Sequence, residues 1–293
     1  MLWVSDEWKD YEVLDTSDGE RLERWGKYIL VRPDPQVIWN TPKERREWKK
    51  FDARYVRSNT GGGHWSDHKL PERWQIKYKD YLTFNVKPMN FKHTGVFPEQ
   101  AANWDFIREK VAGAAAKRPV RVLNLFAYSG GATLAAAAGG AEVFHVDASK
   151  GMVQWAKENA VASGLSGCPI HWMVDDCAKF IQREIRRGRK YDGIIMDPPS
   201  YGRGPSGEIW KMETSFYPFL QETAKLLSDD PLFVIINSYT TGLAPSAVSY
   251  AADVVFGEKY GGKCEAGELG LPVKESGLML PCGATGRWTP DGK

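Results

Sequence analysis

The chain has 293 residues, of which 42% are hydrophobic, so it is long enough for one large domain plus a smaller one and apolar enough to exclude disorder as the default. Its net charge of +2 excludes a global basic field, so any nucleic acid must bind a local patch. No run approaches the roughly 18 apolar residues that a membrane helix needs, and residues 1–10 lack the basic start and apolar stretch of a secretory signal.

Residues 1–95 predict a small β-rich module. This part contains many tryptophans, and two interpretations fit them. We favour large rings that fill a thin core, and not a surface on which bases stack. Within it, Thr41 and Glu44 form a capping box, which predicts the start of a helix, and Trp48, Phe51 and Tyr55 recur at helical spacing. The tryptophans of this module are Trp3, Trp8, Trp25, Trp39, Trp48, Trp65 and Trp74.

A β-hairpin is predicted near the end of this module. Residues 74–79 and 82–87 alternate between apolar and polar side chains, with a turn near Lys79. The polar face carries Lys77, Lys79 and Lys87. A solvated sheet face and a surface that grips RNA both fit these lysines, and the two interpretations stay open.

From residue 96 to residue 293 the pattern predicts an α/β domain with a Rossmann-like sheet. Residues 98–116 predict a helix, after which strands and helices alternate regularly, so the sheet is mostly parallel with helices on both faces. A terminal antiparallel hairpin is expected from residues 263–271 and 277–282. The predicted strands are 120–126, 142–146, 170–174, 191–196 and 232–237, and the predicted helices are 131–138, 149–162, 177–187, 213–227 and 245–255.

Small and acidic residues follow the first three of these strands. The turn 127–131 contains two glycines, Asp147 closes the second strand and Asp176 closes the third. A nucleotide-like cofactor across the carboxyl ends of the sheet fits this order, with Asp147 accepting the ribose hydroxyls and Asp176 reading an adenine amino group. Both carboxylates could instead cap helices, although Ser149 is a better cap than Asp147. A dinucleotide fits less well, because Ser129–Leu134 (SGGATL) misses the G-x-G-x-x-G spacing.

Together these motifs carry a family resemblance. The segments 124–131 (NLFAYSGG), 146–149 (VDAS) and 196–201 (MDPPSY), with Asp176 between them, resemble class I S-adenosylmethionine-dependent methyltransferases. The likeness is to the bacterial large-subunit (23S) ribosomal RNA methyltransferase group, and 94–100 (TGVFPEQ) extends it upstream, so it covers roughly residues 80–290. It implies S-adenosylmethionine as cofactor and RNA as partner. It implies a pocket formed by Tyr128, Gly130, Asp147, Ala148, Ser149, Asp176 and Cys177, which Phe97 and Gln100 cover.

The segment Asp197–Tyr201 leaves the fourth strand where a substrate would sit. Its two prolines hold the backbone rigid and remove two N–H donors, so nearby carbonyls face the slot as acceptors. An amine or ring nitrogen could be held by Asp197 and the Pro198 carbonyl, with Tyr201 stacked on a flipped base. This resembles the Asp/Asn-Pro-Pro-aromatic motif of amino-group methyltransferases. Taken singly, each residue could also belong to a rigid turn with a packing tyrosine.

Methylation of cytosine carbon 5 needs a cysteine nucleophile, and none is placed for it. Position 200 is serine, and the fifth strand ends without a thiol. A nitrogen acceptor is therefore favoured. The chain has no Cys-x-x-Cys pair, which predicts free thiols in a reducing cytoplasm. The four cysteines are Cys168, Cys177, Cys264 and Cys282.

Three functions remain to be distinguished. The first is an RNA methyltransferase in which residues 1–95 grip the RNA. In it, Arg203 lies in a predicted loop over the acceptor and contacts a phosphate. The alternative for Arg203 is an arginine exposed to solvent. The second is a methyltransferase for a small molecule or a protein. The third is a non-catalytic RNA-binding protein, against which the intact Asp147 and Asp197 argue. The histidines show no metal-ligand spacing, so no metal is expected.

Overall fold

The computed structural model describes residues 1–58, 62–66, 70–89, 91–203 and 209–292. The chain forms two compact units. The first, here called the α/β unit, comprises Met1–Trp3, Ala102–Leu269 and Gly283–Lys293. The second, here called the β unit, comprises Val4–Ala101 and Gly270–Cys282.

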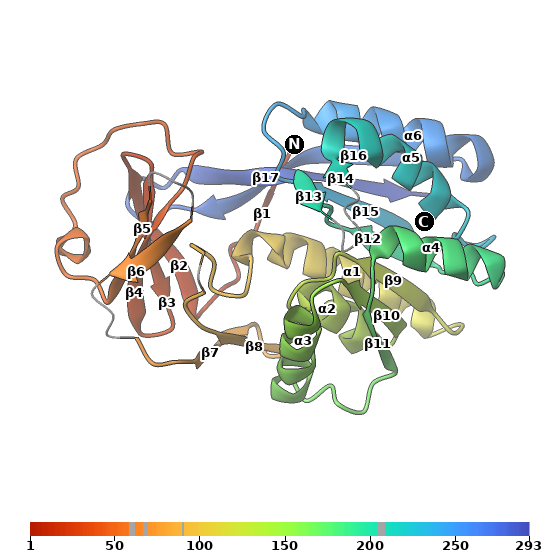
Figure 1. Ribbon diagram of the computed structural model, residues 1–293, viewed down its shortest axis with the longest axis horizontal. Helices are drawn as coiled ribbons and strands as arrows, with labels where there is room; N and C mark the ends of the chain where they lie inside the picture. The colour runs from red at the N-terminus through yellow and green to blue at the C-terminus, as the bar shows by residue number, and fades with distance from the viewer. Residues whose placement is uncertain (59–61, 67–69, 90, 204–208, 293) are drawn as a thin grey trace. The chain divides into compact units, whose positions relative to one another are not determined.

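An eight-stranded sheet forms the centre of the α/β unit, in the order β1-β16-β17-β15-β12-β9-β10-β11 (Figure 1). The five strands from β15 to β11 are parallel, and β17 is antiparallel to β15. The predicted mostly parallel sheet with a C-terminal antiparallel hairpin is therefore confirmed. The strands are β1 (Leu2–Val4), β9 (Arg121–Leu125), β10 (Glu142–Asp147), β11 (Ile170–Val174), β12 (Gly193–Met196), β15 (Phe233–Ser238), β16 (Lys263–Pro272) and β17 (Met279–Thr289).

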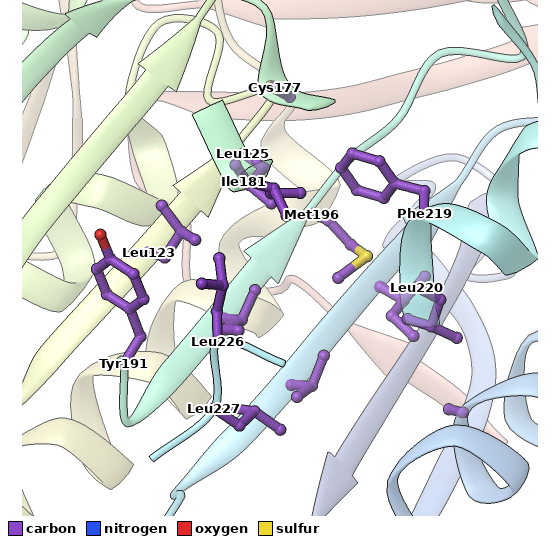
Figure 2. Close-up of a cluster of buried hydrophobic side chains, with 14 of the residues drawn as sticks. Leu123, Leu125, Cys177, Ile181, Tyr191, Met196, Phe219, Leu220, Leu226 and Leu227 are labelled. Atoms are coloured by element: carbon purple, nitrogen blue, oxygen red, sulfur yellow. The ribbon is translucent and has the colours of Figure 1, made fainter. Parts of the chain in front are cut away.

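Helices cover both faces of this sheet (Figure 1). Alternate residues of each strand point to opposite faces, so Leu123 and Leu125 pack under α4, α5 and α6, while Asn124 faces α2. Figure 2 shows the apolar cluster on the first face, in which Ile181 of α4 and Phe219 of α5 lie over Met196 of β12. The helices are α1 (Ala101–Ala115), α2 (Gly131–Ala138), α3 (Lys150–Ala162), α4 (Cys177–Arg186), α5 (Met212–Ala224) and α6 (Pro245–Tyr260), and a 3-10 turn, η2 (Pro98–Gln100), precedes α1.

The β unit contains a five-stranded sheet and a separate hairpin, and the hairpin is the one that the alternating segments of the sequence predict. The sheet order is β2-β3-β4-β5-β6, and β7 pairs with β8 in an antiparallel hairpin that turns at Lys79, whose φ is 49°. The tryptophans before residue 95 are all buried or half-buried, which confirms their packing role. The strands are β2 (Tyr11–Ser17), β3 (Glu20–Trp25), β4 (Tyr28–Pro33), β5 (Ala53–Arg57), β6 (Gly63–Ser66), β7 (Trp74–Tyr78) and β8 (Leu82–Val86).

A buried ionic cluster links the strands β2, β3 and β4. Glu23 is fully buried and accepts hydrogen bonds from the Tyr11 hydroxyl at 2.6 Å and from Arg32 Nη2 at 2.7 Å. Arg21 lies 3.3 Å from Glu23 and 3.6 Å from Asp34. Burial alone raises the pKa of Glu23, but the two arginines outweigh it and hold that pKa at about 2.

The predicted helix from Thr41 is wrong. The structure has only a 3-10 turn, η1 (Arg46–Trp48), and then strand β5. The Thr41 hydroxyl donates to the Thr16 carbonyl at 3.0 Å instead of capping a helix, and Trp48 Nε1 donates to Asp15 at 2.7 Å. Tyr55 is buried in β5, opposite Trp65 of β6. Long-range strand pairing therefore overrides a local pattern that aromatic spacing made helix-like.

The tip of the C-terminal hairpin belongs to the β unit and not to the α/β unit. Val273 bridges Val13 of β2, and Lys274 N–H donates to the Val13 carbonyl at 2.9 Å. The β unit also extends to Ala101, beyond the expected boundary at residue 95. The sequence pattern does not reveal these memberships, because the strands β16 and β17 are long enough to serve both units.

Candidate active site

The turn after β9 has an unusual backbone. Phe126, Tyr128 and Gly130 have φ of 56°, 49° and 92°, so alternate residues are left-handed. For a residue with a side chain this conformation costs about 1–2 kcal/mol. Three bonds hold it: Phe126 N–H donates to Cys177 Sγ at 3.3 Å, Tyr128 N–H to Asp147 Oδ2 at 2.8 Å, and Gly130 N–H to the Ala127 carbonyl at 3.0 Å.

Asp147 connects this turn to the end of β10. Its Oδ2 accepts the Tyr128 N–H, and its Oδ1 accepts the Ser149 N–H at 2.8 Å. Burial raises the pKa of the Asp147 carboxyl, and these two backbone bonds oppose that rise. Each carboxylate oxygen has a second lone pair, so both can accept one further hydroxyl. The adjacent Ala148 and Ser149 are exposed.

The two glycines of the turn are required by packing inside the unit. A Cβ on Gly130 would lie 2.9 Å from the Ala156 Cβ of α3, and a Cβ on Gly131 would lie 2.5 Å from the Trp104 ring of α1. Gly130 also needs its positive φ. Their first identifiable role is therefore to let α2 start close to α1 and α3.

Asp176 and Cys177 lie at the start of α4, at the carboxyl end of β11. Asp176 Oδ1 accepts the Lys179 N–H at 2.9 Å, so Asp176 caps α4, and Ser149 likewise caps α3 by accepting the Met152 N–H. Capping takes one lone pair of Asp176 and leaves others that could accept a ligand. The role of Asp176 as a cofactor ligand therefore stays a prediction. Cys177 is buried behind the turn, with its thiol against Phe126.

A buried polar chain that the sequence did not indicate lies under the turn. Asn124 Nδ2 donates a hydrogen bond to Thr133 Oγ1, and Thr133 Oγ1 shares a hydrogen bond with His145 Nδ1; each of the two distances is 2.9 Å. Asn159 donates to the Ser129 carbonyl at 2.9 Å. Burial lowers the pKa of His145 to about 3, so its ring is neutral at physiological pH. Only the alternation along β9 and β10, which puts polar side chains on an inner face, could have signalled this chain.

The diproline turn follows β12 beside this site. Pro198 is buried and Asp197 is half-buried, whereas Tyr201 is 51% exposed. The Pro199 carbonyl accepts Trp210 Nε1 at 2.6 Å, and Ser200 Oγ accepts the Thr240 hydroxyl at 2.8 Å. The turn is thus held from two sides.

A short hairpin continues from the turn. Its strands are β13 (Tyr201–Arg203) and β14 (Ile209–Lys211), with Tyr201 opposite Lys211. Gly202 and Arg203 therefore belong to a strand and not to the predicted loop. The rest of that predicted loop, residues 204–207, lies outside the described residues, as does the side chain of Arg203. Trp210 contacts Phe126 and Phe219, with ring centroids 5.7 and 5.3 Å apart. Trp210 thereby couples the diproline turn to the turn after β9. That turn, residues 126–131, is called the cofactor turn below, after the role that the sequence predicts for it. A lone tryptophan in a polar segment does not indicate such a coupling.

Comparison with known proteins gives the family. Residues 35–242 match the S-adenosylmethionine-dependent methyltransferase family. A crystal structure of a SAM-dependent methyltransferase from Agrobacterium tumefaciens is 36% identical and covers 99% of this chain and 94% of its own, with a TM-score of 0.93. The chain belongs to the S-adenosylmethionine-dependent methyltransferases.

Curated relatives of this methyltransferase are named for an RNA substrate. Ribosomal RNA large subunit methyltransferase K/L of Shewanella frigidimarina is 30% identical over 212 residues, which are 71% of this chain and 26% of that protein. Ribosomal RNA large subunit methyltransferase K of Neisseria meningitidis is 27% identical and aligns over 79% of this chain and 66% of its own length. The chain spans about a quarter of the length of the K/L relatives that it matches.

The residues of the methyltransferase fit its cofactor. Asp147 keeps acceptor capacity for two ribose hydroxyls, and the small exposed Ala148 leaves room beside it. A putative methyltransferase solved in complex with SAH shares the fold, with a TM-score of 0.69 at 19% identity. Phe97 and Gln100, expected to cover the cofactor, belong to the β unit, and that role stays a prediction.

Three of the four thiols of the methyltransferase, those of Cys177, Cys264 and Cys282, are poor nucleophiles. Burial raises the pKa of Cys177 and Cys282 far above the ordinary range and that of Cys264 to about 12. All four cysteines, Cys168 included, are free thiols. A buried thiol with a raised pKa holds little thiolate at neutral pH, so the structure offers these three side chains no activation.

The lysines expected to grip RNA differ in their surroundings. Lys77 is exposed on β7, Lys79 forms an ion pair with Glu7, and Lys87 is half-buried. Only Lys77 thus presents its full charge to solvent among the three. Within the described residues no helix is long and apolar enough to cross a membrane, and no group of three metal-ligating side chains gathers.

Proposed function

We propose that this methyltransferase methylates a base of large-subunit ribosomal RNA, and that the acceptor is a nitrogen and not cytosine carbon 5. The diproline turn beside the cofactor turn carries the proposal, because it places acceptor groups and an exposed tyrosine at one edge of the sheet. The names of the curated relatives support the RNA substrate. The raised pKa values of the buried cysteines support a nitrogen acceptor.

Bound S-adenosylmethionine supplies an electrophilic methyl group on a positively charged sulfur. Asp147 would hold the ribose through its remaining lone pairs, and the turn at Tyr128 and Gly130 would lie along the ligand. Asp176 would accept the adenine amino group, next to Cys177. Phe97 and Gln100 would shield this side from water.

The acceptor base would be positioned by the diproline turn. Trp210 already occupies the Pro199 carbonyl, so the Pro198 carbonyl and the Asp197 carboxylate are the acceptors assigned to the base. Tyr201 would stack on the flipped base. Alignment of acceptor and methyl carbon is the main catalytic contribution in this proposal, because it turns a bimolecular displacement into a local one.

The β unit would grip structured RNA through Lys77, with weaker contributions from Lys79 and Lys87, and Arg203 would meet a phosphate. Of these four basic residues, Lys79 pairs with Glu7 and Lys87 is half-buried, so RNA affinity would come from a few contacts. The free thiols agree with a cytoplasmic enzyme.

Mass mapping of modified nucleosides tests the proposal. In a strain that lacks this gene, one methylated base of the large-subunit RNA should be lost and should return with the wild-type gene but not with Asp197→Ala. The purified chain should transfer a labelled methyl group to RNA from that strain. Unchanged ribosomal RNA, with transfer to a protein or a small molecule instead, would contradict the proposed substrate.

A further inference from the structure

A groove lies between α4 and α5 that the proposed catalytic roles do not use. Its volume is about 700 Å³, which is in the range of ligand-binding sites. Its lining includes Asp176, the proposed adenine ligand, and Trp210, which donates a hydrogen bond to the Pro199 carbonyl of the diproline turn. The groove therefore adjoins both halves of the candidate active site.

The floor of the groove is apolar. It is formed by Ile181 of α4, Trp210 of β14, and Pro218 and Phe219 of α5. Ile181 and Phe219 project from the two helices over the same face of the sheet (Figure 2). Ile209, which also lines the groove, is 56% exposed. Aromatic side chains such as Trp210 stack bases without regard to sequence.

The α4 side of the groove is cationic. Lys179, Arg183 and Arg186 recur three or four residues apart, so they share one helix face. Arg183 pairs with Asp175, while Arg186 is exposed and has no carboxylate partner in the described part of the chain. The acid opposite, Glu222, already accepts bonds from Gln182 and Lys225. This leaves a positive edge above an apolar floor.

We propose that this groove holds the unpaired RNA next to the methylated nucleotide, with a flanking base over Trp210 and Pro218 and a phosphate at Arg186. This inference rests on the proposed function. A flipped target base requires its neighbours to be splayed from the stack, and they then expose apolar faces joined by an anionic backbone. An apolar floor with a cationic edge is complementary to that strand, whereas an acidic edge would repel it.

Two variants and one control test the groove. Arg186→Glu reverses the unpaired charge, and Thr214→Trp fills the groove from an exposed position of α5. Lys157→Glu makes the same charge change at an exposed position of α3, which packs on β10 and β11 rather than in the groove. RNA binding, kcat/KM for RNA and the affinity for S-adenosylhomocysteine are measured for each.

Arg186→Glu should weaken RNA binding about tenfold and make the slope of log K against log salt shallower by about one. Thr214→Trp should lower kcat/KM for RNA by a similar factor. Lys157→Glu should change neither the RNA affinity nor kcat/KM by more than twofold. The affinity for S-adenosylhomocysteine should stay at the wild-type value in all three.

Three outcomes are distinguishable. Weaker S-adenosylhomocysteine binding in the groove variants would make the groove part of the cofactor site and overturn the inference. Groove variants that behave like Lys157→Glu on an RNA that the wild type methylates would also overturn it, with the proposed function intact. The third outcome is that the wild type does not methylate RNA and that the groove variants impair methyl transfer to a protein. This would overturn both the proposed function and the assignment of the groove to RNA.

Discussion

At the scale of single residues, Asp147 carries the cofactor prediction. Its two oxygens hold the turn and keep one lone pair each, which we propose accept the ribose hydroxyls. Asp147→Ala should weaken the binding of S-adenosylhomocysteine by at least about a hundredfold, because two hydrogen bonds to a charged acceptor are lost. Titration calorimetry measures this. Asp176→Ala is the companion variant, and a smaller loss with Asp147→Ala than with Asp176→Ala would reverse the assigned roles.

Tyr201 separates binding from turnover. It is exposed on β13 and is not needed to build the cofactor turn. Tyr201→Ala should leave cofactor affinity unchanged and lower kcat/KM for RNA by about tenfold to a hundredfold, since stacking of one base contributes roughly 1–3 kcal/mol. Tyr201→Phe keeps the ring and should retain activity. Loss of cofactor binding in Tyr201→Ala would place this residue in the other pocket.

The cysteines test the acceptor atom. Alanine at Cys168, Cys264 and Cys282 should leave methyl transfer within about twofold of the wild type, provided that the variant is folded, because a nitrogen acceptor needs no thiol adduct. Cys177 also accepts the Phe126 N–H, so serine replaces alanine there. Cys264→Ser controls for the small cavity that alanine leaves. Complete loss of transfer in folded Cys264→Ala or Cys282→Ala would revive methylation at carbon 5.

At the scale of elements, the cofactor turn depends on how closely α2 and α3 approach. Gly130→Ala adds a Cβ that lies 2.9 Å from Ala156 and forces a positive φ on alanine. It should destabilise the protein by about 2–4 kcal/mol, from backbone strain and overpacking together. Thermal unfolding measures the loss.

A glycine elsewhere provides the matched control. Gly164 also has a positive φ, of 72°, but a Cβ there meets nothing within 4 Å. Gly164→Ala should therefore show the strain alone, about 1 kcal/mol. Equal losses in Gly130→Ala and Gly164→Ala would show that contact with α3 does not determine the identity of residue 130.

At the scale of the whole molecule, the buried ionic cluster makes the stability of the β unit depend on acid pH. The pKa of Glu23 is lowered in the folded state, to about 2, so its contribution is fully present above the unfolded value near 4.5. That contribution is lost as the pH falls from about 4.5 towards 2. Tryptophan fluorescence during thermal unfolding should show the midpoint falling across this window.

Glu23→Gln tests the origin of this acid sensitivity. At pH 7 the variant should be less stable by about 3–5 kcal/mol, because Arg21 and Arg32 stay buried without their carboxylate. It should also lose the part of the pH dependence between pH 4.5 and 2. A variant that retains the full acid transition would assign it to other carboxylates.

Because the chain has two units, the family of the protein and the identity of its substrate depend on different parts of the structure. The α/β unit holds both turns of the candidate site, so the methyltransferase family follows from this unit and its neighbours in the comparisons. RNA recognition is assigned to the β unit and to the groove between α4 and α5. Specificity can therefore change without any change in the sheet that binds the cofactor.

The sequence by itself determined the alternation of the five parallel strands with their helices and the acidic residues at the strand ends, but not β1, β13 or β14. Asp147 ends β10 and Asp176 follows β11, as predicted, because apolar periodicity and strand termini are local properties of the chain. The diproline turn was likewise identifiable, since proline restricts the backbone wherever it occurs.

Only the tertiary structure decided which distant segments meet. The contact of Trp210 with Pro199 and Phe126, the groove that Trp210 lines, and the membership of the hairpin tip in the β unit all depend on long-range packing. The same reason explains the failed helix at Thr41, where pairing of β5 with its neighbours outweighed the spacing of aromatic residues. Local patterns specify elements, but burial against partners far along the chain selects among them.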